Sequence, residues 1–422
     1  MVRTMKDSGV DWIDSIPEHW TISRTKNYYT NHKYVVGDKA AEYERLALTL
    51  NGVMKRPKDD STGLQPEEFS GYQILSTDEL VFKLIDLQNI STSRVGLSPY
   101  TGIVSPAYII LHKKEGVNSK YGEYFFLSMW QREIFNQMGD DGVRSSLNAS
   151  DLLNIPYTFP PLTEQQKIAD FLDKQCSEID AVLTKTKESI EEYKLLKNAI
   201  ITQSVTKGIR PNRKMKDSGI EWVGEIPEEW DCFYLSQIFV PVKNKNVGLQ
   251  ENNLLSLSYG NIIRKNINTI FGLLPENFEG YNIIQENDLV LRLTDLQNDH
   301  KSLRVGLAKE RGIITSAYLS LRNKSENLAA YFYYLLHTFD ILKGFYGMGA
   351  GVRQGLNWNE VRSLRIIAPK DMSEQKEISD YLNKKCFEID TLINKKEQLI
   401  TELETYKKSL IYEYVTGKKE VQ

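Results

Sequence analysis

Cysteine is scarce in this chain, and neither sign of charge is in large excess. The three cysteines among 422 residues, Cys176, Cys232 and Cys386, have no second cysteine or histidine nearby at metal-ligand spacing. They therefore predict neither a zinc site nor a disulfide framework, and they suit a reducing cytosol. The formal net charge of −3 excludes a protein that holds nucleic acid by overall positive charge alone. Any contact with nucleic acid must use local basic side chains or a partner.

Neither a secretory leader nor a membrane span is expected from the pattern. Residues 1–7 contain no apolar core, which argues against secretion. The most apolar stretch, residues 328–345, contains His337, Asp340 and Lys343, so it predicts a buried amphipathic helix rather than a membrane span. We therefore expect a cytoplasmic protein. The apolar content of 41% is enough for at least two cores.

What the chain does have is a long internal repeat. The sequence MKDSG at 5–9 returns at 215–219, a shift of 210 residues, and the same shift maps Glu178 onto Glu388. Solenoid repeats are far shorter, at about 20–50 residues. The repeat therefore predicts two whole domains, each followed by the same connecting element. A natural ligand for such a molecule presents two sites at a fixed separation.

Each copy has three parts in the same order. A leading segment, at 11–20 and 221–230, carries Trp and Pro at matching places and predicts an aromatic clasp of structural character. A domain follows in which short runs between turn residues predict strands, with helical patterns after them. A long polar helix ends each copy. The expected fold class is α+β: two pseudo-symmetric mixed α/β domains separated by an antiparallel coiled coil of two long helices. The expected bounds are 1–160 for the first domain, 161–208 for the first long helix, 209–370 for the second domain and 371–416 for the second long helix.

The long helices carry a coiled-coil pattern. Apolar residues recur at spacings of three and four over about five heptads. Polar residues interrupt the two seams at matching places, Thr186 with Lys396 and Lys197 with Lys407, which favours a fixed register. The helices could pair within one chain or between chains, and the equivalence of the halves favours an intrachain antiparallel pair. The expected seam consists of Leu172, Cys176, Ile179, Leu183, Ile190, Tyr193, Leu382, Cys386, Ile389, Ile393, Ile400 and Leu403.

Catalytic motifs are poorly represented. No set of Ser, His and Asp recurs at matching positions, and none of the five histidines is repeated at its equivalent place. The sequence NIPY at 154–157 resembles an amino-methyltransferase Asn-Pro-Pro-Tyr box but lacks the first proline. The glycine-rich stretch 347–351 is followed by Val352, where a dinucleotide fingerprint needs its third glycine. We therefore expect no catalytic residue, no metal site and no cofactor in this chain.

Polar motifs suited to a DNA groove recur in both copies. The sequence DLQN closes a predicted strand in each, and its amides can pair with adenine while its Asp can accept from cytosine. The sequences RVGL and GVR also recur, and arginine beside glycine lets a guanidinium and backbone amides approach a phosphate together. The alternative for each motif is a polar β-turn on a solvated edge of the domain.

The two copies differ most over 25–65 and 240–275, where each has its own basic loop. Two domains alike in frame but different in one region predict readers of two different targets. The candidate DNA-binding residues of the first copy are Asn51, Lys55, Arg56, Lys83, Asp86, Gln88, Asn89, Arg94, Arg144 and Asn148. Those of the second copy are Tyr259, Arg264, Lys265, Arg292, Asp295, Gln297, Asn298, Arg304, Arg353 and Asn357.

Three stretches resemble one known family. The sequence PPLTEQQKIADFL at 160–172 strongly resembles the junction between recognition domain and conserved helix in specificity (S) subunits of bacterial type I restriction–modification systems. The stretches KDSGIEW at 216–222, with Ile226-Pro227, and RLTDLQN at 292–298 are similar to the same family. The resemblance covers essentially the whole chain, in order and in duplicate.

The resemblance implies a division of labour among subunits. Each globular domain would be a target-recognition domain that reads one half of a split sequence in double-stranded DNA through the major groove. The helices would fix the spacer between the halves and dock two methyltransferase (M) subunits. Those M subunits would bind S-adenosylmethionine and methylate adenine N6, and translocase/nuclease (R) subunits would join for restriction. The S subunit itself holds no catalytic residue and no cofactor.

Two other classes of function stay open. A two-headed adaptor that binds protein rather than DNA predicts no salt-dependent affinity for DNA, whereas phosphate contacts make affinity fall steeply with salt. A stand-alone nuclease or methyltransferase predicts turnover on DNA, with S-adenosylmethionine present and no partner. Both rivals can therefore be tested with the purified chain.

Overall fold

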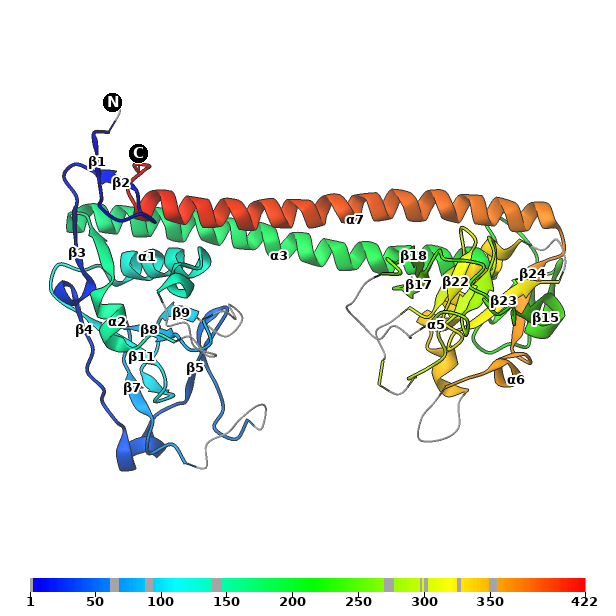
Figure 1. Ribbon diagram of the computed structural model, residues 1–422, viewed down its shortest axis with the longest axis horizontal. Coiled ribbons are helices and arrows are strands. Elements are labelled where there is room, and N and C mark those ends of the chain that lie inside the picture. The colour runs from blue at the N-terminus through cyan, green and yellow to red at the C-terminus, as the bar shows by residue number, and fades with distance from the viewer. Residues whose placement is uncertain are drawn as a thin grey trace. The chain divides into compact units, whose positions relative to one another are not determined.

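The structure is a computed structural model that divides into two compact units. One unit is Met1–Lys187 with Glu397–Gln422, and the other is Glu188–Lys396. Each unit contains a mixed α/β domain and a part of both long helices (Figure 1). The division runs through the helices, and the four bounds expected from the sequence stay a prediction. The structure describes residues 3–60, 68–87, 94–138, 146–268, 277–296, 298–299, 303–324, 328–348 and 355–421.

The first unit has a sheet in the order β4-β11-β8-β9, with the antiparallel pairs β1–β2, β7–β10, β3–β12 and β5–β6 around it. Its strands are β1 (Met5–Asp7), β2 (Ser15–Pro17), β3 (Thr21–Arg24), β4 (Tyr29–Thr30), β5 (Leu46–Thr49), β6 (Gly52–Lys55), β7 (Gln73–Leu75), β8 (Leu80–Lys83), β9 (Arg94–Leu97), β10 (Gly102–Val104), β11 (Ile109–Lys113) and β12 (Pro156–Phe159). Its shorter helices are η1 (Thr25–Asn27), η2 (Gly37–Glu42), α1 (Ser119–Gln131), η3 (Ile134–Gln137) and α2 (Ala149–Asn154).

The second unit repeats this plan with a sheet in the order β16-β23-β20-β21 and the antiparallel pairs β13–β14, β19–β22, β15–β24 and β17–β18. Its strands are β13 (Met215–Asp217), β14 (Glu225–Pro227), β15 (Trp230–Tyr234), β16 (Phe239–Pro241), β17 (Leu255–Ser258), β18 (Asn261–Arg264), β19 (Asn282–Ile284), β20 (Leu289–Leu291), β21 (Val305–Leu307), β22 (Gly312–Ile314), β23 (Leu319–Asn323) and β24 (Arg365–Pro369). Its shorter helices are α4 (Leu235–Ile238), α5 (Ala329–Ile341), η4 (Gly344–Gly347) and α6 (Trp358–Val361). The predicted α+β class with two equivalent domains is confirmed.

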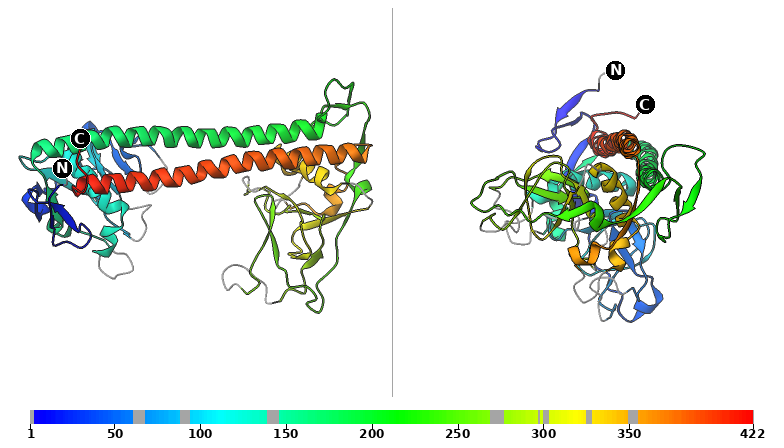
Figure 2. Two further views of the ribbon diagram at one scale, coloured as in Figure 1. Left: turned by 90° about the horizontal axis from the view of Figure 1, so that it is seen from above. Right: turned by 90° about the vertical axis from the view of Figure 1, so that its right-hand side faces the viewer.

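The long helices are α3 (Leu162–Lys207) and α7 (Met372–Val415). In the first unit, Phe171 stacks near Tyr414, with ring centroids 4.5 Å apart, and Asp180 pairs with Lys407. From the first contact to the second, the residue numbers increase along α3 and decrease along α7. The two helices are therefore antiparallel in this unit. In the second unit the same holds, because Lys396 lies over the Tyr193 ring while Lys197 pairs with Asp390. The predicted antiparallel pairing within one chain is therefore confirmed, and Figure 2 shows the two helices side by side.

Each domain packs onto the beginning of one long helix and the end of the other. In the first unit, Tyr124 Oη of α1 donates to Asp173 of α3 at 2.7 Å, and the core includes Leu172 of α3 and Ile411 of α7. In the second unit, Tyr334 Oη donates to Asn383 at 2.8 Å. The core there includes Leu382 of α7 and Val205 of α3. Burying each apolar side chain contributes about 1.5–3 kcal/mol, so these contacts fix each domain on its helices.

The seam between the helices is apolar but carries polar contacts at equivalent positions. Lys197 Nζ lies 2.6 Å from Asp390, and Lys407 Nζ lies 2.6 Å from Asp180. Of the two interruptions noticed in the sequence, Lys197 with Lys407 therefore forms reciprocal ion pairs, whereas Thr186 donates to Val182 O and Lys396 lies over the Tyr193 ring. Nine of the expected seam residues are buried, and Tyr193, Ile400 and Leu403 are half-buried. No helix in the described part of the chain joins the length and the apolar run that a membrane crossing requires.

Candidate nucleic-acid interface

Each unit projects one β-hairpin whose tip carries a large exposed side chain. The β5–β6 tip holds Leu50 and Asn51, and the β17–β18 tip holds Tyr259 and Gly260. Leu50 is 61% exposed and Tyr259 is 74% exposed. Positive φ angles of 45° at Tyr259 and 80° at Gly260 match a tight two-residue turn that follows the twist of its strands. The sequence regions that differ most between the copies therefore include the tips of equivalent hairpins.

The basic residues beside these hairpins are held by carboxylates. Lys55 pairs with Glu44 at 2.5 Å and lies 5.2 Å from the centre of the Tyr100 ring. Arg56 pairs with Asp60 at 2.7 Å. The hydrogen bond to Glu44 raises the pKa of Lys55, so this ammonium group stays charged. A DNA phosphate would have to replace these carboxylates as partners of the two cations.

The second hairpin repeats this arrangement. Arg264 Nε donates to both oxygens of Glu310, at 2.7 and 2.9 Å, which holds the pKa of Glu310 below its usual range. Lys265 follows the hairpin with an exposed side chain, and its backbone N–H donates to Leu254 O at 2.8 Å. The pair Arg264–Glu310 lies on the surface, where water screens the two charges. A phosphate could therefore displace it at little cost.

The first DLQN motif follows a strand end where two cations face each other. Lys83 on β8 is in register with Arg94 on β9. Partial burial, and then the nearby charge of Arg94, lower the pKa of Lys83. Like charges directly opposite on a sheet repel each other, and the charge of Asp86 offsets part of this effect on Lys83. Asp86, which begins the motif, has a φ of 57°, the same value as Asp295 in the other unit.

In the second unit the equivalent arginine is turned inward. Arg304 is fully buried, and its guanidinium donates to backbone carbonyls, including Thr294 O at 2.8 Å. Arg292 lies 3.4 Å from Asp299, and the amide of Asn298 donates to Asp295 at 2.8 Å. For Arg304 these contacts support the structural alternative rather than a direct phosphate contact.

Two candidate asparagines begin helices. Asn148 accepts from the backbone N–H of Asp151 at 3.1 Å and forms a capping box at the start of α2. Asn357 does the same with Glu360 at the start of α6. An N-cap is worth about 1 kcal/mol of stability, so the contacts again support the structural alternative. Five other candidates lie outside the described residues: Gln88, Asn89, Arg144, Gln297 and Arg353.

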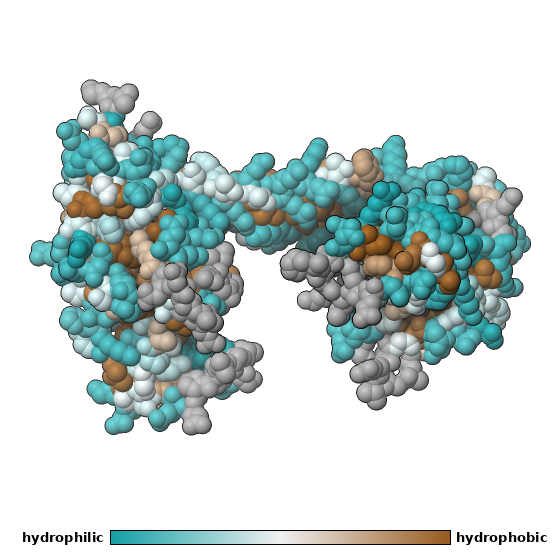
Figure 3. Space-filling view, in the orientation of Figure 1, coloured by the Kyte–Doolittle hydropathy of each residue, from teal (hydrophilic) through white to brown (hydrophobic). Residues whose placement is uncertain are grey.

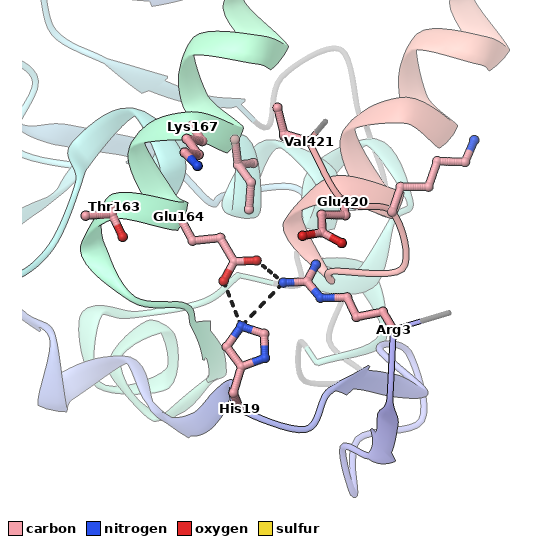
Figure 4. A pocket seen from close by; sticks show the side chains of 9 residues that line it. Arg3, His19, Thr163, Glu164, Lys167, Glu420 and Val421 are labelled. Carbon is pink, nitrogen blue, oxygen red and sulfur yellow. Dashed lines mark hydrogen bonds and ion pairs between the residues drawn. The ribbon is translucent and has the colours of Figure 1, made fainter. Parts of the chain in front are cut away.

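A carboxylate that the sequence interpretation missed, half-buried at Glu164 and buried at Glu374, fixes the leading segment in each unit. Glu164, near the start of α3, accepts from Arg3 and from His19 at 2.9 Å (Figure 4). It also accepts from Trp20 Nε1 at 2.9 Å. In the second unit, Glu374 accepts from Arg213 and from Trp230 Nε1 at 3.1 Å. The shift of 210 residues maps Arg3, Trp20 and Glu164 onto these partners. That repeat was the signal that could have identified the contact.

The described residues offer no activated group that could start catalysis. Burial raises the pKa of Cys176 to about 11, which suppresses its thiolate form. Burial and then the charge of Lys197 lower the pKa of His337 to about 4, so this imidazole is neutral at pH 7. No group of three or more His, Cys, Asp or Glu residues suited to a metal ion occurs in the described ranges.

Parts of the chain match known proteins in sequence. Residues 49–192 match the family model of the type I restriction modification DNA specificity domain. The chain is 26% identical over 230 residues to the type I restriction enzyme MjaVIII specificity subunit of Methanocaldococcus jannaschii, covering 53% of this chain and 50% of that protein. It is 24% identical over 235 residues to the putative MjaX specificity subunit of the same organism, covering 53% of each. The chain thus spans about half the length of these curated relatives.

Solved structures extend the likeness along nearly the whole chain. A chain from a study of complex assembly and conformational transition in the type I R-M system aligns with a TM-score of 0.70 and 12% identity, over 96% of this chain and 99% of that one. The HsdS subunit from Thermoanaerobacter tengcongensis aligns with a TM-score of 0.51 and 12% identity, over 96% and 98%. At this identity the likeness establishes the fold.

Proposed function

We propose that this chain, a relative of type I restriction–modification specificity subunits that carries their DNA specificity domain, is the DNA-recognition subunit of such a complex. Each unit reads one half of a bipartite sequence in double-stranded DNA. The chain itself supplies recognition, and the chemistry belongs to its partners. The family likeness supports recognition of DNA, and the two-unit construction of the chain supports a target in two halves.

One observation carries this proposal: the two units are built reciprocally from the same parts. Tyr121 Oη donates to Val415 O at 2.9 Å, near the end of α7, in the first unit. Tyr331 Oη donates to Val205 O at 3.0 Å, near the end of α3, in the second. Each domain is therefore fixed on the end of one long helix by the same contact, on α7 in the first unit and on α3 in the second. Two equivalent readers joined through stiff helices suit a DNA target with two half-sites and an unread spacer.

The long helices set the spacer length and dock two methyltransferase subunits in this proposal. They leave large apolar side chains uncovered, with Leu195 70% exposed and Phe387 74% exposed. Figure 3 shows such apolar side chains among mainly hydrophilic ones on the visible face. Leu195 on α3 and Phe387 on α7 belong to the same unit, and uncovered apolar side chains of this kind favour a protein partner. The methyltransferase subunits bind S-adenosylmethionine and methylate adenine N6, and restriction subunits join them for cleavage.

Mapping of methylated adenines tests the proposed function. The chain is co-expressed with its methyltransferase subunit in a host that lacks adenine methylation, and methylated positions are read across the genome. The expected result is a split motif with one methylated adenine in each half. The methyltransferase expressed alone is the control. Methylation that is absent, or that follows a single unsplit motif, would refute the two-reader proposal.

Salt dependence of DNA binding separates the proposal from the adaptor alternative. Each phosphate contact releases counterions, so the logarithm of the association constant falls with the logarithm of salt by about 0.9 per contact. We expect a steep linear decrease for the assembled complex on a duplex that contains the mapped motif. An affinity that does not change with salt would favour the adaptor.

A further inference from the structure

Arg304 forms an unusual clamp beneath the second DLQN motif. Its side chain is fully buried at the start of β21. The Nη1 atom donates to Arg292 O at 3.0 Å and Thr294 O at 2.8 Å, and Nη2 donates to Asp295 O at 3.3 Å and to Asp299 O. One guanidinium thus joins carbonyls that come before the motif, within it and after it. Only the planar fork of arginine can present donors in these directions at once.

Tyr346 on η4 completes this clamp. Its hydroxyl accepts from Arg304 Nε at 3.0 Å and donates to Asp299 O at 3.1 Å. The buried carboxylate of Asp340 accepts from the backbone N–H of Arg304 at 2.7 Å, so a negative charge lies close to the buried cation. Buried charges are stable only when paired and hydrogen-bonded. The guanidinium of Arg304 meets that condition through its five acceptors, and these contacts order the segment around Asp295.

The clamped segment holds a conformation that needs support. Asp295 has a φ of 57°, in the left-handed region that is unfavourable for a residue with a side chain. Its carbonyl also accepts from Asp299 N at 3.2 Å, while its carboxylate accepts from the Asn298 amide at 2.8 Å. The backbone at both ends of this turn is therefore bound to one arginine. The directions of the Asp295 and Asn298 side chains depend on that anchor.

The first unit does not have the same partners for its arginine. The shift of 210 residues maps Tyr346 onto Asn136 and Asp340 onto Trp130. Arg94, equivalent to Arg304, lies opposite Lys83 in its sheet, just as Arg304 lies opposite Arg292, so the difference between the units lies in the residues at the places of Tyr346 and Asp340. The set of Arg304, Tyr346 and Asp340 thus belongs to the second copy.

We propose that Arg304 and Tyr346 are positioning residues that hold the turn around Asp295 and Asn298 in the geometry that reads the second half-site. This inference rests on the proposed function, because it takes the DLQN turn as a DNA-reading element. Neither residue contacts DNA. They act through the backbone of the turn, and they set base discrimination in one half of the target only.

The test uses the assembled complex of this chain with its methyltransferase subunit. Methylation rates are measured on duplexes that carry single base-pair changes in one half-site or the other. The half-site of the second unit is the one that stays unchanged when residues 25–65 are exchanged for those of a relative. Misplaced bidentate contacts lose discrimination, so Tyr346→Phe is expected to reduce base discrimination in the second half-site about fivefold or more. Arg304→Lys, which keeps the charge but loses the fork, is expected to do the same or more.

Tyr331→Phe is the matched control, because it removes a buried hydroxyl in the same unit that donates to Val205 O rather than to the turn. It should lower the thermal midpoint and leave discrimination in both half-sites at the wild-type level. Discrimination that is unchanged in Tyr346→Phe, or lost equally in both half-sites, would overturn the inference. A wild-type complex without a split motif would instead refute the proposed function, so the two failures are distinguishable.

Discussion

The two units share one frame, but the groove beside each hairpin tip is built from different side chains. In the first unit the groove between the β5–β6 tip, α1 and the long helices is lined by charged residues, among them Lys120, Asp173 and Lys187. The equivalent groove of the second unit keeps charged residues such as Lys197 and Asp390, but it also exposes Tyr259 and Phe387, where the first unit has Leu50 and Ser177. The contacts that build the frame are repeated, whereas the accessible lining has diverged.

This difference separates the residues that keep the fold from those that face a partner. Both copies have the same tyrosine contact that fixes the domain on a long helix. Both also have the same contact from a tryptophan to Glu164 or Glu374. The hairpin tips, the grooves and the Arg304 clamp differ between the copies. Divergence limited to such places is what two readers of different half-sites require, since each must keep its position while it changes its target.

The largest expected effect is a change of target in one half only. Exchange of residues 25–65 for those of another family member should replace the first half-site and leave the second unchanged, because the β5–β6 hairpin lies within the exchanged segment. The measurement is the map of methylated adenines. Exchange of residues 240–275 is the matched control and should change the other half-site. A change of both half-sites after either exchange would break the comparison between the units.

The next largest effect concerns Glu164 and Glu374, the carboxylates that hold the leading segment of each unit. The Glu374 side chain is 4% exposed and the Glu164 side chain is 20% exposed. Removal of one partner from a buried ion pair costs about 3–5 kcal/mol, and less where water reaches the pair. Glu374→Gln should therefore lower the free energy of unfolding by about 3 kcal/mol, and Glu164→Gln by about 1–2 kcal/mol. Urea unfolding followed by tryptophan fluorescence measures both, and equal losses would contradict the difference in burial.

The frame could be predicted from the sequence because its signals are periodic. Apolar residues at heptad spacing indicated the seam, and the shift of 210 residues indicated two equivalent domains. Lys197 and Lys407 were recognised as seam interruptions, but their partners Asp390 and Asp180 depend on the antiparallel register, which a single helix does not reveal. The heptad pattern of one helix does not indicate which residue of the other helix lies opposite each lysine.

The candidate site was predictable only in part. Arg94 and Arg304 occupy the same place in the repeat. Arg304 is fully buried, because carbonyls of the preceding turn converge on its guanidinium and Tyr346 of η4 covers it. Asn148 and Asn357 have a side chain that could read a base, but in the structure each caps the start of a helix. Side-chain direction at a turn is set by tertiary contacts, and the short motif does not contain them.

The third expected effect is that the stability of the second unit depends on pH through His337, which the first unit lacks. Burial and then the charge of Lys197 lower the pKa of His337 to about 4, from an ordinary value near 6.5 in the unfolded chain. The unfolded state then binds more protons than the folded state below pH 6.5, so stability is lost as pH falls from about 6.5 to 4. The loss from this group approaches about 3 kcal/mol at the acid end.

The control is His337→Leu, because the equivalent residue of the first unit is Leu127. It removes the titrating group but leaves the neighbouring Tyr333, Lys197 and Asp390 of the groove in place. Unfolding free energies of the variant and the wild type, measured from pH 7 to pH 4, should diverge by the stated amount. Parallel curves would mean that His337 is not the source of the acid sensitivity.

The smallest expected effect tests whether the two seam ion pairs are equivalent. Lys197–Asp390 and Lys407–Asp180 each have one partly covered lysine and one more exposed aspartate, with side-chain exposures of 26% and 49%, and of 22% and 56%. Pairs this accessible to water contribute about 0.2–1 kcal/mol. Double-mutant cycles with Lys→Met and Asp→Asn should therefore give similar small coupling energies in the two units. A coupling well above this range at one pair only would mean that the helices are held more tightly beside one domain. The two seam ion pairs would then be equivalent in position but not in energy.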